Sequence, residues 1–146
     1  MADLDLVRSV AGADHYAVIV TPRADGGMQA SVVSGGVMNH PVSGETVVAL
    51  VARGRTVKLA NLRRNRRATV VFRNGHSWAT VEGQADLIGP DDDFPGFDRE
   101  RVPQLLRDVF TAAGGTHDNW PEYDRVMAED RRCAVFIHPE RIYGRV

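Results

Sequence analysis

The chain has 146 residues and a formal net charge of -1, and its hydrophobic, aromatic and charged fractions are those of an ordinary globular protein. These values exclude a disordered or fibrous chain, and the length suits a single domain, residues 1–146, built around one core. The near-neutral charge argues against a nucleic-acid-binding domain. No apolar stretch approaches the roughly 18 residues of a membrane span, and the first residues lack a signal-peptide pattern, so we expect a cytoplasmic protein.

Hydrophobic periodicity divides the chain into strands with a few helices. The expected strands span 15–21, 28–34, 45–52, 67–73, 76–88 and 132–137, with a closing segment at 141–146. The expected helices span 3–11, a short stretch after Thr56, a stretch from Pro103 to Ala113, and roughly 118–129. The strands are joined in hairpins without regular strand–helix alternation, which excludes a doubly wound parallel sheet. We therefore predict a mainly β fold, a small antiparallel barrel with accessory helices.

Four local signals refine this prediction. The pair Gly35-Gly36 is expected to end the second strand, and Pro139 is expected to interrupt the last one. Gly83 lies inside a strand pattern and predicts the bulge or bend that a barrel needs in order to close. The acidic run 91–93 is expected to be a solvated loop of like charge.

The most distinctive stretch runs from Arg53 to Arg67 and contains Lys58, the only lysine in the sequence. Thr56 fits the N-cap position of a short helix, whose first backbone N–H groups are unpaired and carry the positive end of the helix dipole. Arg55, Lys58 and Asn61 have a spacing that lets them converge on this helix start, which predicts a pocket for phosphate or carboxylate. The alternative is an ordinary solvated helix whose arginines face water.

Other motifs are informative through their absence from the sequence. The five histidines show no metal-ligand spacing and no cysteine partners, so no metal site is expected. There is no nucleophile elbow, dinucleotide fingerprint or Walker loop, and no acid–base pair identifies catalytic residues. Cys133 is expected to be a buried strand thiol, and Trp120 and Tyr123 to be core or interface anchors.

A resemblance to a known family rests on Gly54-Arg-Thr-Val-Lys-Leu-Ala-Asn-Leu-Arg-Arg64, which lies between an apolar strand and the strand Ala68-Thr-Val-Val-Phe72. This stretch resembles the phosphate-binding segment of the pyridoxamine-phosphate-oxidase-like split β-barrels. More narrowly, the chain is similar to the flavin and deazaflavin oxidoreductases of actinobacteria, especially the branch that uses coenzyme F420. The resemblance covers most of the chain, up to the ending Pro139-Glu-Arg-Ile-Tyr-Gly144, and the arginine-rich composition fits an actinobacterial source.

The resemblance implies how a cofactor phosphate would be held. Arg55 and Lys58 would pair with the phosphate, Thr56 would donate its hydroxyl or its backbone N–H, and Asn61 would hold the turn or a ribityl oxygen. The family's usual Asp-Pro-Arg is replaced here by a more basic run, residues 65–68, which could suit the anionic polyglutamyl tail of F420.

The resemblance also implies where the cofactor ring lies and what binds it. The strand residues Gln29, Ser31, Val32 and Val33 would lie along the tricyclic ring, and Trp78 would stack near the cofactor, from either subunit. Family members are typically homodimers with the cofactor at the subunit interface, so we expect a homodimer here.

The expected function is an F420-dependent reductase, in which hydride passes from the reduced deazaflavin to a conjugated small organic acceptor. One alternative is an FMN-binding oxidoreductase of the same fold. Another is a non-catalytic module that carries a cofactor or binds RNA through its arginines. No motif constrains the physiological substrate or the proton donor.

Overall fold

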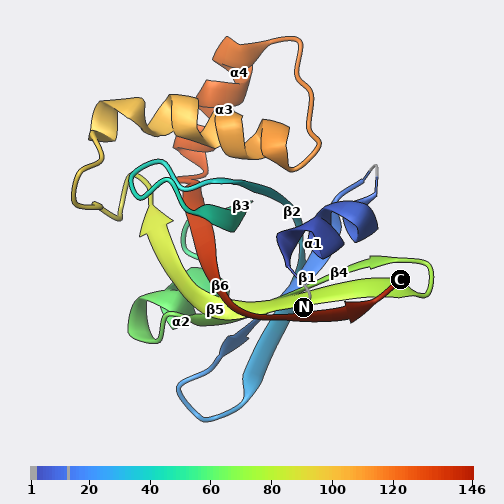
Figure 1. Cartoon of the computed structure of the whole chain (residues 1–146). Coiled ribbons are helices and arrows are strands. Elements are labelled where there is room, and N and C mark those ends of the chain that lie inside the picture. The colour runs from blue at the N-terminus through green and yellow to red at the C-terminus, as the bar shows by residue number, and fades with distance from the viewer. Residues whose placement is uncertain (1–2, 13) are drawn as a thin grey trace.

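The computed structural model describes residues 3–12 and 14–146, and at its centre is a closed antiparallel barrel (Figure 1). The strands are β1 (Tyr16–Pro22), β2 (Met28–Asn39), β3 (Thr46–Ala52), β4 (Arg67–Asn74), β5 (Ser77–Ile88) and β6 (Cys133–Arg145). They follow one another around the barrel in the order β1-β2-β3-β6-β5-β4, and β4 closes the barrel against β1. The predicted antiparallel barrel with accessory helices is confirmed.

The helices pack around the barrel, with α3 and α4 together on one side of it (Figure 1). They are α1 (Leu4–Ala11), α2 (Val57–Arg64), the short 3-10 helix η1 (Arg99–Arg101), α3 (Val102–Ala112) and α4 (Trp120–Glu129). The apolar face of α1, which includes Val7 and Val10, is buried in the barrel core. α3 lies over β2, β3 and β6, and α4 packs on α3. Within the described residues, no helix is both long and apolar enough to cross a membrane.

β3 separates two hydrophobic clusters, which explains its uninterrupted apolar sequence. Val48 and Leu50 point into the barrel, while Val47 and Ala49 point outward against α3 and α4. All four side chains are fully buried. A strand with helices on one face and the barrel core on the other needs apolar residues on both faces, so the prediction for this run is confirmed.

The prediction that Gly35-Gly36 ends the second strand is wrong, because β2 continues through both residues to Asn39. A Cβ on Gly36 would lie 2.0 Å from the carbonyl oxygen of Ala112, and one on Gly35 would lie 3.3 Å from the Phe72 ring. Gly36 therefore allows the end of α3 to approach the strand backbone closely, and Gly35 leaves room for the Phe72 ring.

The bulge predicted at Gly83 is confirmed, since the register between β5 and β6 shifts between Glu82 and Gly83. A Cβ on Gly83 would lie 1.8 Å from the carbonyl oxygen of His138, so only glycine fits there. The prediction that Pro139 interrupts the last strand is wrong, because β6 runs on to Arg145. Pro139 pairs with Gly83 at the bulge, a position where a sheet tolerates a residue without an N–H group.

The acidic run is solvated in part, as the sequence predicted, because Asp91 and Asp93 are exposed, but its charges do not stand alone. Each carboxylate forms an ion pair with an arginine from another segment or turn, in the pairs Asp91–Arg131, Asp92–Arg63 and Asp93–Arg99. These pairs tie the loop after β5 to α2, to the turn before β6 and to η1.

Candidate functional site

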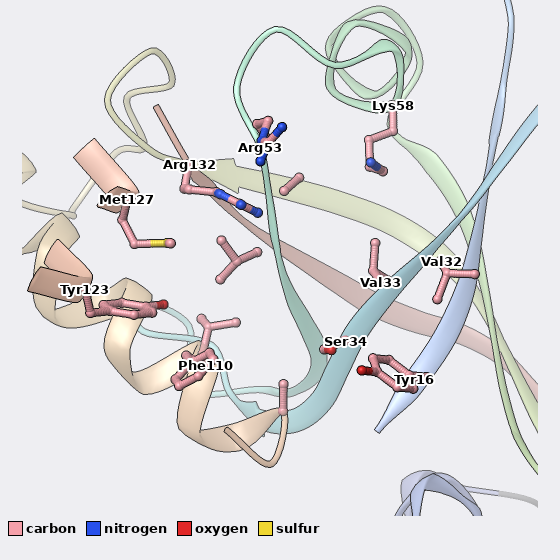
Figure 2. A pocket seen from close by; sticks show the side chains of 14 residues that line it. Tyr16, Val32, Val33, Ser34, Arg53, Lys58, Phe110, Tyr123, Met127 and Arg132 are labelled. Carbon is pink, nitrogen blue, oxygen red and sulfur yellow. The ribbon is translucent and has the colours of Figure 1, made fainter. Parts of the chain in front are cut away.

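A pocket of about 400 Å³ lies between α3 and α4 on one side and β2 and the start of α2 on the other (Figure 2). Its volume is near the lower end of the roughly 300–1,000 Å³ that small-molecule sites occupy. Cationic side chains lie at one end of the pocket, and aromatic and aliphatic side chains form the rest of its lining. The two parts differ in chemistry, so we describe them in turn.

The cationic end is created by strand pairing. β3 and β6 are antiparallel, and their last paired residues are Ala52 and Cys133. One step beyond this pair stand Arg53 and Arg132, which are therefore brought to the same end of the two strands. Both line the pocket, together with Lys58 from the first turn of α2.

Gly54 fixes how closely these two chain segments approach each other. Its N–H group donates to the carbonyl oxygen of Asp130 at 3.0 Å. A Cβ on Gly54 would lie 2.6 Å from the carbonyl oxygen of Arg131, so a side chain at this position would push the segments apart. The position of Arg53 beside Arg132 thus depends on a residue without a side chain.

The three cations outnumber the anions near them. Arg132 donates to one oxygen of Asp130 at 3.2 Å, and Arg53 lies 3.9 Å from the same oxygen. Among the residues that the structure describes, no carboxylate lies within ion-pair distance of the Lys58 ammonium. Burial, and then the positive charge of Arg132, lower the pKa of Lys58. An anion in the pocket would relieve this imbalance of three positive charges against one negative charge.

The apolar end of the pocket is formed by α3 and α4. The rings of Phe110 and Tyr123 lie 5.0 Å apart, and Met127 extends beside them (Figure 2). Tyr123 belongs to the second hydrophobic cluster, as the sequence predicted, and its hydroxyl donates to the carbonyl oxygen of Leu106 at 3.1 Å. Burial raises the pKa of Tyr123 to about 12, so this hydroxyl stays protonated and bound to the backbone.

The mouth of the pocket continues into an exposed apolar face of the barrel. Tyr16 and Val32, which line the pocket, are 59% and 69% exposed. Val18 and Met28 are exposed on the same face, since Val18 pairs with Val32 across the strands and Met28 lies four residues before Val32 on β2. A row of exposed apolar side chains on neighbouring strands is typical of a surface that another molecule covers.

Three of the residues that the sequence singled out, Lys58, Val32 and Val33, line this pocket. Arg55 is exposed, with a positive φ of 62°, and lies outside it. Thr56 occupies the N-cap position, but its hydroxyl donates to the carbonyl oxygen of Arg53 at 2.8 Å instead of capping the helix.

The side chain of Asn61 ties α2 to the barrel. It is buried, and its amide nitrogen donates to the hydroxyl of Thr21 at 3.1 Å, while its amide oxygen accepts from Arg64. These bonds give Asn61 a position in the fold rather than in the pocket lining.

The remaining predicted residues also lie away from the pocket. Gln29 and Ser31 are half-buried on β2, and within the described chain the buried hydroxyl of Ser31 has no hydrogen-bond partner. Trp78 lies on β5, where its ring meets that of Tyr143 edge-on at 6.0 Å, and it borders a separate hollow with Arg145. Their roles toward a cofactor stay predictions.

The basic run that the sequence associated with an anionic tail has internal partners. Arg66 pairs with Asp86, and Arg67 donates to Glu140 at 2.9 Å. Both arginines border a hollow near the turn between β1 and β2 that is distinct from the pocket. Their charges are therefore largely compensated within the chain.

Sequence reasoning missed Arg132 and Arg53 as parts of a site. Each arginine directly flanks a buried strand, but only the pairing of β3 with β6 brings the two together. A local pattern does not reveal which distant strands pair, so no sequence signal identified this combination.

No protein-family model matches the chain. Among solved structures, it is similar over 99% of its length to the conserved hypothetical protein Rv2991 from Mycobacterium tuberculosis, at 18% identity, 84% coverage of that chain and a TM-score of 0.69. It is similar to an F420 reductase at 13% identity, with 93% and 94% of the two chains covered and a TM-score of 0.62. It is also similar to a pyridoxamine 5'-phosphate oxidase-related, FMN binding protein from Nostoc punctiforme, at 12% identity, 97% and 79% coverage and a TM-score of 0.59.

The chain is a split β-barrel. At these identities the likeness establishes the fold, which is the pyridoxamine 5'-phosphate oxidase-like type that the sequence resemblance predicted. Proteins of this split-barrel fold include an FMN binding protein and an F420 reductase. The pocket described above is the part of this split barrel whose residues can be tested for such a ligand.

Proposed function

We propose that this protein is an oxidoreductase that binds coenzyme F420 in the pocket and reduces a conjugated small organic acceptor. One observation carries the proposal: Arg53, Lys58 and Arg132 lie at one end of a mostly apolar pocket, and only the two arginines are near a carboxylate, that of Asp130. The similarity to an F420 reductase and to an FMN binding protein supports a flavin-type cofactor in this fold.

The donor set fits such a cofactor. An excess of two positive charges suits a phosphate monoester, or a phosphodiester followed by a carboxylate, through charge-assisted hydrogen bonds. The aromatic and aliphatic wall of Phe110, Tyr123 and Met127 suits a flat ring system. The two ends of the pocket thus match the two chemical parts of a phosphorylated flavin or deazaflavin.

The chain's contribution is orientation and the exclusion of water. When bound, the reduced cofactor supplies the hydride. Lys58 and the two arginines hold the anionic end, and the α3–α4 wall keeps water from the ring. The described lining contains no histidine and no carboxylate, and the Tyr123 hydroxyl donates to the backbone.

We further propose that a second copy of the chain covers the exposed face around Tyr16 and Val32 and completes the cofactor site. The pocket is open toward this face, and both residues belong to its mouth. A homodimer would bury the apolar row and enlarge the wall around the ring. Val32→Glu should weaken self-association, as measured by analytical ultracentrifugation, and should weaken cofactor binding with it.

FMN is the second candidate, because the cation set accepts its phosphate monoester equally well. The deciding experiment titrates the purified chain separately with F420 and with FMN and follows fluorescence. Tighter binding of F420 supports the proposal, and tighter binding of FMN favours the alternative. Absence of micromolar binding of either contradicts both.

A carrier differs from an enzyme in turnover. With F420 bound, the reduced cofactor is mixed with a panel of quinones and enones, and its absorbance is followed. Enzyme-dependent oxidation supports a reductase, whereas tight binding without oxidation favours a non-catalytic carrier.

A further inference from the structure

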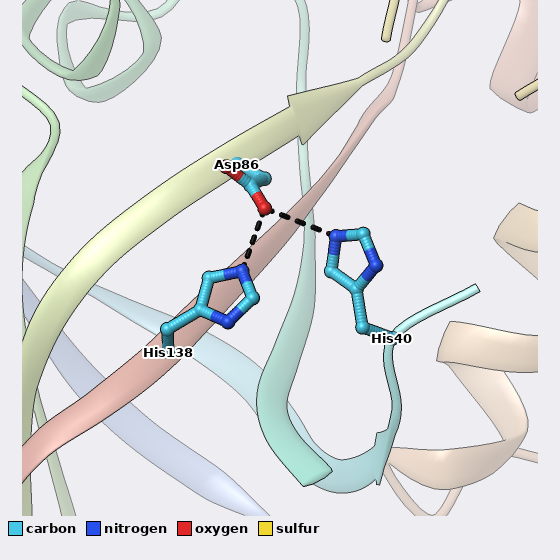
Figure 3. Close-up of side chains that lie close together, drawn as sticks. All are labelled: His40, Asp86 and His138. Atoms are coloured by element: carbon cyan, nitrogen blue, oxygen red, sulfur yellow. Dashed lines mark hydrogen bonds and ion pairs between the residues drawn. The ribbon is translucent and has the colours of Figure 1, made fainter. Parts of the chain in front are cut away.

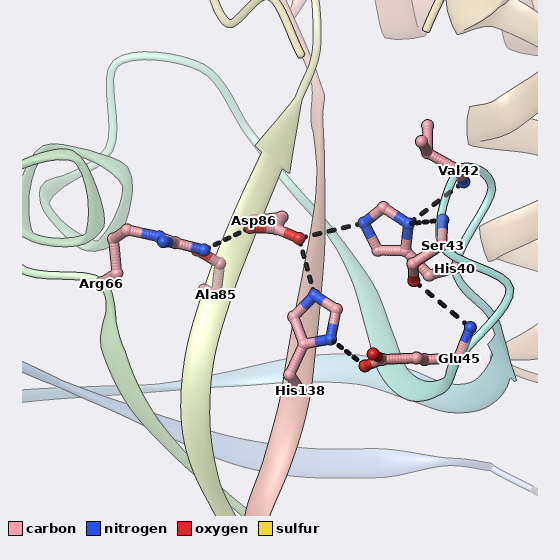
Figure 4. A network of polar contacts seen from close by, with 8 residues as sticks. All are labelled: His40, Val42, Ser43, Glu45, Arg66, Ala85, Asp86 and His138. Atoms are coloured by element: carbon pink, nitrogen blue, oxygen red, sulfur yellow. Dashed lines mark hydrogen bonds and ion pairs between the residues drawn. The ribbon is translucent and has the colours of Figure 1, made fainter. Parts of the chain in front are cut away.

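A second group of charged side chains lies outside the pocket, where the turn between β2 and β3 meets β5 and β6 (Figure 4). We call it the His138 cluster; its members are His40, Glu45, Arg66, Asp86 and His138. Nε2 of His138 lies 2.6 Å from Oδ2 of Asp86, and Nδ1 lies 2.9 Å from Oε2 of Glu45. A carboxylate only accepts hydrogen bonds, so both contacts form when both ring nitrogens carry a hydrogen. The geometry is that of an imidazolium held between two carboxylates.

The other histidine of the cluster is arranged as a neutral ring. His40 is 2% exposed, and its Nδ1 accepts the backbone N–H groups of Val42 at 3.1 Å and Ser43 at 3.2 Å. An accepting nitrogen carries no hydrogen, so the ring's hydrogen sits on Nε2, which lies 3.0 Å from Oδ2 of Asp86 (Figure 3). Phe94 and Phe136 pack against the ring at 5.3 and 5.2 Å, and burial lowers the pKa of His40.

The charges of the cluster balance when it holds one extra proton. Asp86 pairs with Arg66 through its second oxygen, so the carboxylates of Asp86 and Glu45 face the guanidinium of Arg66 and the imidazolium of His138. A proton added to His40 would place a second charged ring 5.2 Å from His138. The two histidines are therefore not charged at the same time. His138 carries the extra proton, and His40 stays neutral.

We propose that the His138 cluster is a site for a single proton, which latches the turn between β2 and β3 onto the barrel. Glu45 belongs to the end of this turn and His40 to its start, while Asp86 and His138 lie on β5 and β6. With the proton bound, His138 joins Glu45 to Asp86. Without it, one nitrogen of His138 has no hydrogen to donate, and one of the two links is lost.

The same three side chains could be read as a metal site, since ligand atoms of His40, Asp86 and His138 lie within 4.8 Å of one another. A metal-bound histidine normally donates its other N–H group to an acceptor. Nδ1 of His40 instead faces two donors, so a metal at Nε2 would have to displace the ring's only hydrogen. Arg66 beside Asp86 adds a further positive charge. The cluster fits a proton better than it fits a metal.

The latch predicts an optimum in stability against pH. Burial lowers the pKa of His138, but the hydrogen bonds and charges of Asp86 and Glu45 outweigh it, so the pKa lies above the usual 6.5. Protonated His138 therefore stabilises the fold fully below pH 6.5, and this stabilisation is lost as the pH rises through the folded-state pKa of His138. His40, with its lowered pKa, destabilises the fold as the pH falls below 6.5. Stability should be greatest near the ordinary histidine pKa and decline on both sides.

The first test follows the histidine side chains of the wild-type chain by ¹H–¹⁵N NMR between acidic and alkaline pH. We expect His138 to keep both nitrogens protonated at a pH where the histidine of a short reference peptide has already lost its charge. We expect His40 to remain neutral with its hydrogen on Nε2. Titration of His138 at the same pH as the reference peptide, or at a lower pH, would overturn the proposal.

The second test compares urea unfolding of His138→Gln and of the matched control His76→Gln across the same pH range. Between pH 6.5 and about 8, below the pH at which the raised pKa of the buried Cys133 thiol would add a rise of the same sign, the unfolding constant of the wild type and of His76→Gln should rise by up to about tenfold per pH unit. In His138→Gln this rise should disappear; an unchanged rise would overturn the proposal. If His138→Gln does not fold, the NMR titration of the wild type decides.

A metal arm completes the experiment. One equivalent of zinc sulfate should leave the NMR signals of His40 and His138 unchanged at neutral pH. Saturable changes in the signals of both histidines at one equivalent of zinc would overturn the proposal and indicate a metal site instead. None of these readouts involves a cofactor, so their outcome is independent of the proposed oxidoreductase function.

Discussion

The pocket and the His138 cluster both collect charged side chains in half-buried surroundings, but they differ in charge balance. In the pocket, Arg53 and Arg132 share one carboxylate, and Lys58 has none within ion-pair distance among the described residues. In the His138 cluster, each carboxylate faces a cation or an imidazolium. A charge removed from water needs a partner. In the His138 cluster the chain supplies the partner charges, and the ion pairs stabilise the fold. In the pocket it does not, so a bound ligand can supply the missing negative charge.

The largest expected effect is on stability and comes from the balanced region. Asp86→Asn removes the carboxylate shared by Arg66, His138 and His40, and it should lower the free energy of unfolding by about 3 kcal/mol in urea titrations. Cofactor affinity should stay unchanged. Asp5→Asn, which breaks an exposed pair with Arg8, is the matched control and should cost less than about 1 kcal/mol. Equal losses in the two variants would contradict the comparison.

The next effect should be on binding and comes from the unbalanced region. Lys58→Met keeps the aliphatic stem and removes one charge-assisted hydrogen bond, worth about 1.5–3 kcal/mol, so the dissociation constant should rise roughly tenfold to hundredfold. The free energy of unfolding should be unchanged or slightly larger, because an unpaired, partly buried charge is gone. Calorimetric titration with F420 and with FMN measures the change, and Arg8→Met serves as the control. Unaltered affinity would exclude Lys58 from the anion site.

A smaller effect of opposite sign tests the charge excess itself. Asp130→Asn removes the carboxylate that Arg53 and Arg132 share, so the pocket should bind an anionic cofactor about twofold to fivefold more tightly at low salt. Because the gain is electrostatic, it should shrink as salt is added. Weaker binding at low salt would show that Asp130 acts mainly by orienting the arginines.

The smallest effect should follow removal of the outermost partner of the cluster. Glu45 is well exposed, so Glu45→Gln should lower the free energy of unfolding by less than about 1 kcal/mol. It removes one of the two carboxylates that raise the pKa of His138, so the alkaline decline in stability should begin at a lower pH. An alkaline decline that begins where it does in the wild type would argue against the Glu45–His138 contact.

Local patterns in the sequence were sufficient for the barrel and for part of the site. The apolar run of β3 predicts a strand buried on both faces, and Gly83 predicts the bulge, because each depends on the residue's own immediate surroundings. Lys58 was identified by its uniqueness and its place at a helix start, and it does line the pocket.

Long-range pairing decided what the sequence could not predict. Arg53 meets Arg132 only because β3 pairs with β6, and His40 meets Asp86 and His138 only because a turn docks on two strands. Gly35-Gly36 was misread for the same reason: Gly36 serves the approach of α3 and Gly35 leaves room for Phe72 on β4, both far along the chain.

The sole cysteine offers a consequence of a different kind. Cys133 is 1% exposed at the start of β6, and burial, followed by the charge of Asp92, raises the pKa of its thiol. A thiol reagent attacks the thiolate, so the native barrel should resist labelling, and reaction should require an opening of β6 from its neighbours. Because the chain has one cysteine, the labelling rate reports the opening of the barrel at one known site, and no engineered probe is needed.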